Sequence, residues 1–137
     1  MTFDEAAREF AKARNKSQGR PLCGRGNNTR LHRVDDDGTP AYAVRYHATN
    51  VVVIEEGDIY TLNTGGWQTV TTKERINAFG PVRIWQEQFV WYVQPANRDH
   101  RIPFEDGMRF DAAGNLLDGQ SDPLAQLDDA MALAGGS

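Results

Sequence analysis

Two adjacent apolar segments, Val51–Glu55 and Asp58–Asn63, constrain the fold of this chain more than any other feature of its sequence. They flank the dipeptide Glu56-Gly57, and this arrangement predicts an antiparallel hairpin with a two-residue turn. The predicted register pairs Glu55 with Asp58, Ile54 with Ile59, Val53 with Tyr60 and Val51 with Leu62. Both faces are then largely apolar, so we expect a central hairpin, with Val51, Val53 and Tyr60 buried and a terminal helix or a partner covering the second face.

Two further hairpins and two short strands are predicted from the same signals of alternation and turn residues. The first hairpin pairs residues 30–34 with 41–47 around Asp36-Asp37-Gly38, and the second pairs 82–86 with 89–93 around Glu87-Gln88. The second hairpin places Ile84 opposite Trp91 and Val82 opposite Val93, with Arg83, Trp85, Val90 and Tyr92 on the other face. The two short strands are expected at residues 101–104 and 108–111.

Three helices are predicted from capping residues and apolar stripes. Thr2-Phe3-Asp4-Glu5 forms a capping box, which predicts a helix over residues 3–16 that stops at Ser17-Gln18-Gly19. A second capping box at Thr71–Glu74 predicts a short helix over residues 72–79, ended by Gly80-Pro81. Pro123 suits the first position of a last helix, at about residues 122–134.

These elements predict one α+β domain of 137 residues, because that length is typical of a single domain. Its centre is an antiparallel sheet of about five to eight short strands, flanked by an N-terminal helix, a short inserted helix and a C-terminal helix. The predicted division is an N-terminal helical segment at 1–17, a basic loop at 18–29, a sheet core at 30–117 with the short helix at 72–79, and the last helix at 122–134.

Composition argues against most catalytic classes. The single cysteine, Cys23, has no cysteine partner, and the three histidines, His32, His47 and His100, lack the spacing of metal ligands. No nucleophile elbow, P-loop or zinc-protease motif occurs. We therefore expect no catalytic residues, no metal and no cofactor. The start of the chain does not have the pattern of a signal peptide, and no apolar run has the length of a membrane span, so we expect a cytoplasmic protein without a membrane partner.

The most unusual stretch is Thr64–Asn77, where two glycines and a tryptophan precede the short helix. When the hairpin register is extended outward, this stretch meets the residues after Tyr46, so that one end of the sheet gathers polar and aromatic side chains. The candidate binding residues at that end are His47, Asn50, Trp67, Thr71, Lys73 and Arg75. The competing interpretation is structural: a Gly-Gly bend, a tryptophan in the core and threonines that cap a helix. We expect Trp67 to be structural and Arg75 to be available for contacts.

The block GGWQTVTTKERIN, with the later WYVQ and IPFEDGMRFD segments, resembles small uncharacterised bacteriophage and prophage proteins that share a GGWxTVTTKxRIN pattern. The resemblance covers roughly residues 42–111. It implies a phage or prophage origin, that is, a mobile element, and it implies no activity and no catalytic residues.

Two functions from different classes remain open, ahead of an enzyme around His47 as a distant third. The first is an accessory protein that binds a host or phage macromolecule, most plausibly a protein, without catalysis, such as a host-takeover or anti-defence protein. The second is a nucleic-acid-binding module, because residues 1–34 are rich in basic side chains and one sheet face carries aromatics. The residues of this second function are Arg20, Arg25, Arg30, Arg83, Trp85 and Tyr92.

Overall fold

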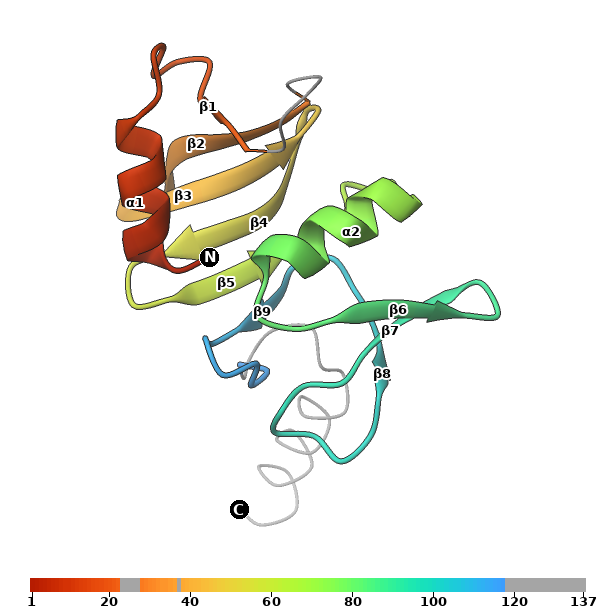
Figure 1. The fold of residues 1–137 in the computed structure, drawn as a ribbon. Helices are drawn as coiled ribbons and strands as arrows, with labels where there is room; N and C mark the ends of the chain where they lie inside the picture. Colours follow the sequence, from red (N-terminus) through yellow and green to blue (C-terminus); the bar gives the residue numbers. More distant parts are fainter. Residues whose placement is uncertain (23–27, 37, 118–137) are drawn as a thin grey trace.

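The protein consists of two antiparallel sheets and two helices in the computed structural model, which describes residues 1–22, 28–36 and 38–117 (Figure 1). The elements are α1 (Phe3–Ala11), β1 (Arg20–Pro21), β2 (Thr29–Asp36), β3 (Thr39–Tyr46), β4 (Thr49–Glu55), β5 (Ile59–Leu62), α2 (Val70–Phe79), β6 (Ile84–Glu87), β7 (Val90–Val93), β8 (Ile102–Pro103) and β9 (Met108–Phe110). The larger sheet has the order β1-β2-β3-β4-β5-β9, and the smaller has the order β6-β7-β8. The α+β class, the antiparallel sheet and two of the three helices are as predicted.

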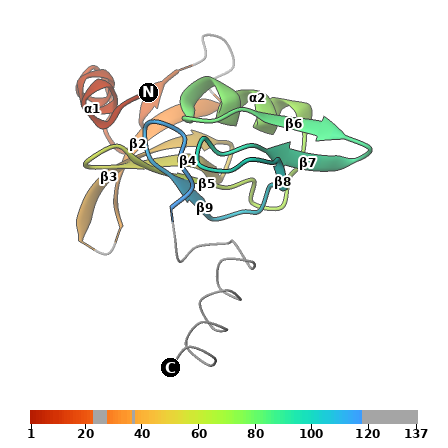
Figure 2. The same cartoon turned by 90° about the horizontal axis from the view of Figure 1, so that it is seen from below.

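Both helices pack on the same face of the six-stranded sheet, as Figure 2 shows from below. Phe3 and Phe10 of α1 contact the ring of Tyr42 on β3, with centroid distances of 5.3 and 5.7 Å. Arg75 of α2 bonds to Thr29 on β2. Because alternate residues of a strand share a face, Thr29 and Tyr42 mark one and the same face, which we call the helix face. The opposite face is called the far face below.

The central hairpin forms, but its predicted register is wrong by one residue. Val52 pairs with Leu62 and Ile54 with Tyr60, because the loop has three residues, 56–58, rather than two. Gly57 and Asp58 both have positive φ, and the Asp58 N–H donates to the Glu55 carbonyl to close the loop. The shift places Val53 on the far face, where it is only half-buried. Val51 and Tyr60 are buried, as predicted.

The register of the β6–β7 hairpin differs from the prediction by two residues. The paired residues therefore change, but each side chain stays on its predicted face. Ile84 pairs with Val93 and Trp85 with Tyr92, and the turn is Gln88-Phe89, where both residues have positive φ. The expected apolar face is confirmed, since Ile84, Trp91 and Val93 are buried. The last two predicted strands are shorter than expected and belong to different sheets. β8 pairs with β7, whereas β9 pairs with β5.

The helix bounds also differ from the prediction. Thr2 caps α1 as expected, but the helix ends at Ala11 rather than residue 16, and Lys16 donates to the carbonyls of Phe10, Ala11 and Ala13. α2 begins at Val70, because Thr69 rather than Thr71 accepts the capping bond, from the Thr72 N–H. Part of the predicted basic loop is strand β1. The predicted last helix, 122–134, lies outside the described residues.

Candidate functional site

A pocket of about 360 Å³ opens where the β3–β4 turn meets the loop between β5 and α2. Its walls are mainly apolar surface and threonine side chains. The lining residues are Tyr46, His47, Ala48, Thr49, Val51, Thr64, Trp67, Thr69 and Thr72. Among these described residues no carboxylate and no Lys or Arg occurs, so the chemistry of the pocket suits an apolar group rather than an ion.

The close approach of Gly65 to Thr49 shapes one wall of this pocket. Gly65 has a φ of +65°, and a Cβ atom there would lie 2.6 Å from the Thr49 hydroxyl oxygen. Only glycine fits this position without a shift of the Thr49 side chain. The sequence predicted that the Gly-Gly stretch meets the residues after Tyr46, and in the structure Gly65 approaches Thr49.

Asp106 holds the loop from the other side. Its carboxylate accepts from both the N–H and the hydroxyl of Thr64, each at 2.8 Å, and Thr64 is buried. The Thr64 hydroxyl oxygen in turn accepts from the Gly66 N–H, and the Thr64 carbonyl accepts from the Trp67 N–H. No local pattern of the sequence signals this link across 42 positions.

Trp67 lies at the rim of the pocket and is 69% exposed. The expectation that this tryptophan fills the core is therefore wrong. Val70, at the first position of α2, is also largely exposed. An aromatic and a branched side chain are therefore exposed to solvent beside the apolar pocket.

The opposite rim is formed by the turn between β3 and β4. His47 has a φ of +54°, and its N–H donates to the Asn28 carbonyl at 2.8 Å. The rings of Tyr46 and His47 lie 4.4 Å apart. His47 and Trp67 are thus the two predicted binding residues that the structure brings to the pocket.

The other four predicted residues lie elsewhere. Asn50 pairs with Arg45 in the β3–β4 register and accepts from its Nε at 2.8 Å. Lys73 lies over the ring of Trp91, and Arg75 donates to the buried Thr29, so Arg75 is not the available group that the sequence suggested. Thr71 is half-buried in the first turn of α2 and is not part of the pocket lining.

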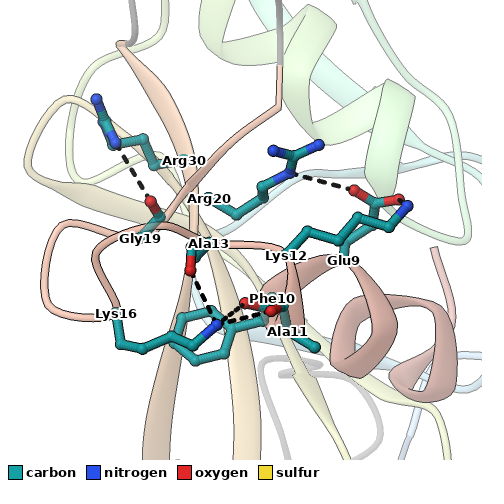
Figure 3. Close-up of polar contacts among 9 residues, drawn as sticks. All are labelled: Glu9, Phe10, Ala11, Lys12, Ala13, Lys16, Gly19, Arg20 and Arg30. Atoms are coloured by element: carbon teal, nitrogen blue, oxygen red, sulfur yellow. Dashed lines mark hydrogen bonds and ion pairs between the residues drawn. The ribbon is translucent and has the colours of Figure 1, made fainter.

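Two arginines of the predicted basic arm contact neighbouring groups in the part of the chain that is described (Figure 3). Arg20 lies 3.5 Å from the Glu9 carboxylate, and Arg30 donates to the carbonyls of Gln18 and Gly19. A hydrogen bond from Lys12, together with the nearby Arg20, lowers the pKa of Glu9. Arg25 lies outside the described residues.

The aromatic face of the small sheet forms as predicted, but it carries an acid. Trp85 and Tyr92 are cross-strand neighbours with ring centroids 6.3 Å apart, and Arg101 stacks over Tyr92 at 4.4 Å. Glu87 pairs with Arg101 and accepts from the Trp85 indole N–H, so the local positive charge is neutralised. Arg83 is exposed beside α2. The aromatic face and the basic arm lie apart in both ribbon views.

Two general findings limit the chemistry of the described ranges, 1–22, 28–36 and 38–117. No three His, Cys, Asp or Glu side chains within them gather closely enough to hold a metal ion. No helix within them has the length and apolar character needed to cross a membrane.

Comparison with protein-family models decides the affiliation of the chain. The model described as Kyanoviridae Gp96 protein matches residues 13–111, more than half of the sequence. The chain belongs to this phage protein family. The Gp96 match confirms the resemblance to phage proteins, and it contains the whole pocket lining. Comparisons of this Gp96 family member with curated proteins and with solved structures find no match.

Proposed function

We propose that this phage protein acts by non-enzymatic binding of another protein, through the pocket between the β3–β4 turn and the β5–α2 loop. The observation that carries the proposal is Trp67, which is 69% exposed at the rim of an apolar-walled pocket of about 360 Å³. Tryptophan dominates binding energy at protein interfaces, and hot-spot residues cluster around pockets that a partner fills.

The occupant that fits this site is an apolar side chain of a partner protein. The pocket has room for one large aliphatic or aromatic group, and Trp67 and Val70 supply apolar surface around it. The loop that carries Trp67 is held by the Thr64–Asp106 bonds and by Gly65 against Thr49, so the site is pre-formed. Pre-formed sites lose less conformational entropy on binding. Host takeover or an anti-defence role would be a consequence of which protein is bound.

The test is affinity capture from phage-infected bacteria, followed by a binding measurement with the purified captured protein. Two variants address the site: Trp67→Ser removes the rim aromatic, and Ala48→Trp fills the pocket from its lining. Phe89→Ser is the matched control, because Phe89 is 91% exposed at the tip of the β6–β7 hairpin, away from the pocket. Thermal melting of all three variants verifies that the fold is retained.

We expect both pocket variants to weaken binding by at least about 2 kcal/mol, which is the usual threshold of a hot spot. The control should bind as the unchanged protein does. Equal capture by all variants, or loss of binding with Phe89→Ser alone, would contradict the proposal.

A further inference from the structure

The far face of the six-stranded sheet is apolar over its central strands, although neither helix of the described ranges lies on it (Figure 2). Val53 of β4 and Ile59 of β5 lie on this face and are only half-buried, and the Ala43 side chain beside Val53 is small. At the β2 end, Gly19 lies against the His32 ring, so the open part of the face extends from β3 to β9. A sheet face that stays in water normally carries polar residues, so this apolar part favours a covering element.

The described part of the chain ends at the border of this same face. Leu116 pairs with Phe110 of β9, which is buried on the helix face through its register with β5 and β4. The next residue, Leu117, donates its N–H to the Arg109 carbonyl at 3.0 Å. Alternation places the half-buried Leu117 side chain on the far face. Residues 118–137 therefore continue from the border of the open apolar surface.

The sequence of residues 118–137 suits that surface in pattern and in reach. Leu124, Leu127 and Met131 have the spacing of one face of a helix. Leu124 is seven positions after Leu117, and an extended segment of that length reaches about 23 Å. Val53 lies on β4, two strands away from β9, which is about 10 Å across the sheet. The segment is thus long enough to bring its first leucine over Val53.

The charges of this segment also complement the far face. Residues 118–137 contain four aspartates and no Lys or Arg. Residues 1–117 contain fifteen acidic and fifteen basic side chains, so the rest of the protein has no net charge that repels the segment. Arg45 and Arg109 lie on the far face, on either side of Val53. Arg45 donates to the neutral Asn50, and Arg109 lies 3.4 Å from Glu55, so the two arginines together exceed the carboxylate between them by one charge.

We propose that the C-terminal segment, residues 118–137, docks on the far face of the sheet of its own molecule, with Leu124, Leu127 and Met131 against Val53 and Ile59. The docked segment covers the open apolar part of the face, and its aspartates lie toward the positive charges at the border. The six-stranded sheet then has α1 and α2 on one face and the C-terminal segment on the other, which is a common layered arrangement.

This docking surface is separate from the pocket of the proposed function. The pocket is lined by Tyr46 and by Thr72 of α2, and Tyr46 shares the helix face with Thr29 through the β2–β3 register. The docked segment therefore leaves the pocket open. A variant in residues 118–137 should leave partner binding intact, so the two proposals can fail independently.

The experiment measures paramagnetic relaxation by NMR in the full chain, with one nitroxide label in the C-terminal segment. Cys23→Ser removes the native thiol, and Ala132→Cys carries the label on the side of the predicted helix away from Leu127. Leu127→Ser, made in this background, removes one leucine of the apolar face. Leu133→Ser is the matched control, because it makes the same change in the same segment at a position off that face.

The readout is the loss of intensity of methyl signals on the two faces of the sheet. We expect Val53 and Ile59 on the far face to lose more intensity than Val52 and Ile54, which are buried on the helix face. Leu127→Ser should lower the ratio of docked to free segment about tenfold, since burial of one leucine side chain is worth at least that factor. Leu133→Ser should leave the pattern unchanged.

Three results would overturn the proposal. The first is an equal loss of intensity on both faces of the sheet. The second is an equal response to Leu127→Ser and Leu133→Ser. The third is the same loss at Val53 in a mixture of spin-labelled protein without isotopes and isotope-labelled protein without a spin label, because the docked segment would then belong to a second copy.

Discussion

Arg75 of α2 donates from Nε to the hydroxyl oxygen of Thr29 on β2 at 2.9 Å, across 46 positions of the sequence. Thr29 is 1% exposed, so its hydroxyl depends on this donor and on a longer contact with Asn28. The bond ties the inserted helix to a strand near the edge of the large sheet. Arg75 therefore has a structural role, whereas the sequence suggested a residue available to a partner.

Replacement of Arg75 by Ala should lower the free energy of unfolding by about 1–3 kcal/mol, because the buried Thr29 hydroxyl would lose its donor. Urea denaturation measures the change. Arg83→Ala is the control, since Arg83 is exposed, and its effect should stay within about 0.5 kcal/mol. A similar small effect for both variants would show that the Arg75–Thr29 bond contributes little.

The sequence predicted which residues share a face of a strand better than it predicted which residues pair across neighbouring strands. The faces of the β6–β7 hairpin were predicted correctly, since alternation along a strand has a fixed period of two. The registers were predicted wrongly, because a register depends on the length of the turn. Asp58, Gln88 and Phe89 adopt positive φ in the turns, and nothing in the sequence at these residues indicated the turn length. A register error of two residues leaves each side chain on its predicted face, as at Trp85. An error of one residue moves the side chain to the opposite face, as at Val53.

The same distinction explains what could be predicted of the site. Extension of the hairpin brought the residues after Tyr46 close to the Gly-Gly stretch, and His47 and Trp67 do line one pocket. The exposure of Trp67 could not be predicted, because it depends on which way the loop turns after Gly66. The Thr64–Asp106 bond joins two loops far apart in the chain, and nothing local indicates it.

The corrected register makes a direct prediction about two neighbouring valines. Val52 is fully buried on the helix face, and Val53 is half-buried on the far face. Val52→Asp should prevent folding, because an unpaired buried charge costs about 3 kcal/mol or more. Val53→Asp should fold with a lower melting temperature, since its carboxylate reaches solvent. Circular dichroism melting of the two variants decides the register, and the reverse order of stability would contradict it.

The two consecutive glycines before Trp67 should respond differently to alanine. Both have positive φ, so each substitution strains the backbone by about 1–2 kcal/mol. At Gly66 nothing lies within 4 Å of the added Cβ, whereas at Gly65 the Cβ would collide with Thr49. Gly65→Ala should therefore be the more destabilising variant in urea denaturation.

A double variant isolates the collision at Gly65. Thr49→Ala removes the side-chain atoms that the new Cβ would meet, so Gly65→Ala should cost less in that background than in the unchanged protein. Gly66→Ala should cost the same in both backgrounds. Additive effects of Gly65→Ala and Thr49→Ala would show that the contact does not shape the loop.

Burial and two nearby arginines lower the pKa of His32 below its usual value of 6.5. The unfolded chain consequently binds a proton on His32 at a pH where the folded protein does not. Stability should therefore decrease as the pH falls through 6.5 toward the folded pKa, and should be independent of His32 at higher pH. The pKa values of Glu9 and Asp111 are also lowered, from 4.5 and 3.8, and their stabilising contributions are lost at more acidic pH.

Urea denaturation between about pH 8 and about pH 3 separates these windows. The unchanged protein should lose stability over the upper part of the acidic range, and His32→Gln should flatten the profile there while leaving the loss at lower pH in place. Arg45→Gln should flatten it in part, because one of the two charges that disfavour the protonated histidine is removed. A profile that His32→Gln leaves unchanged would show that this histidine is not strained by its arginine neighbours.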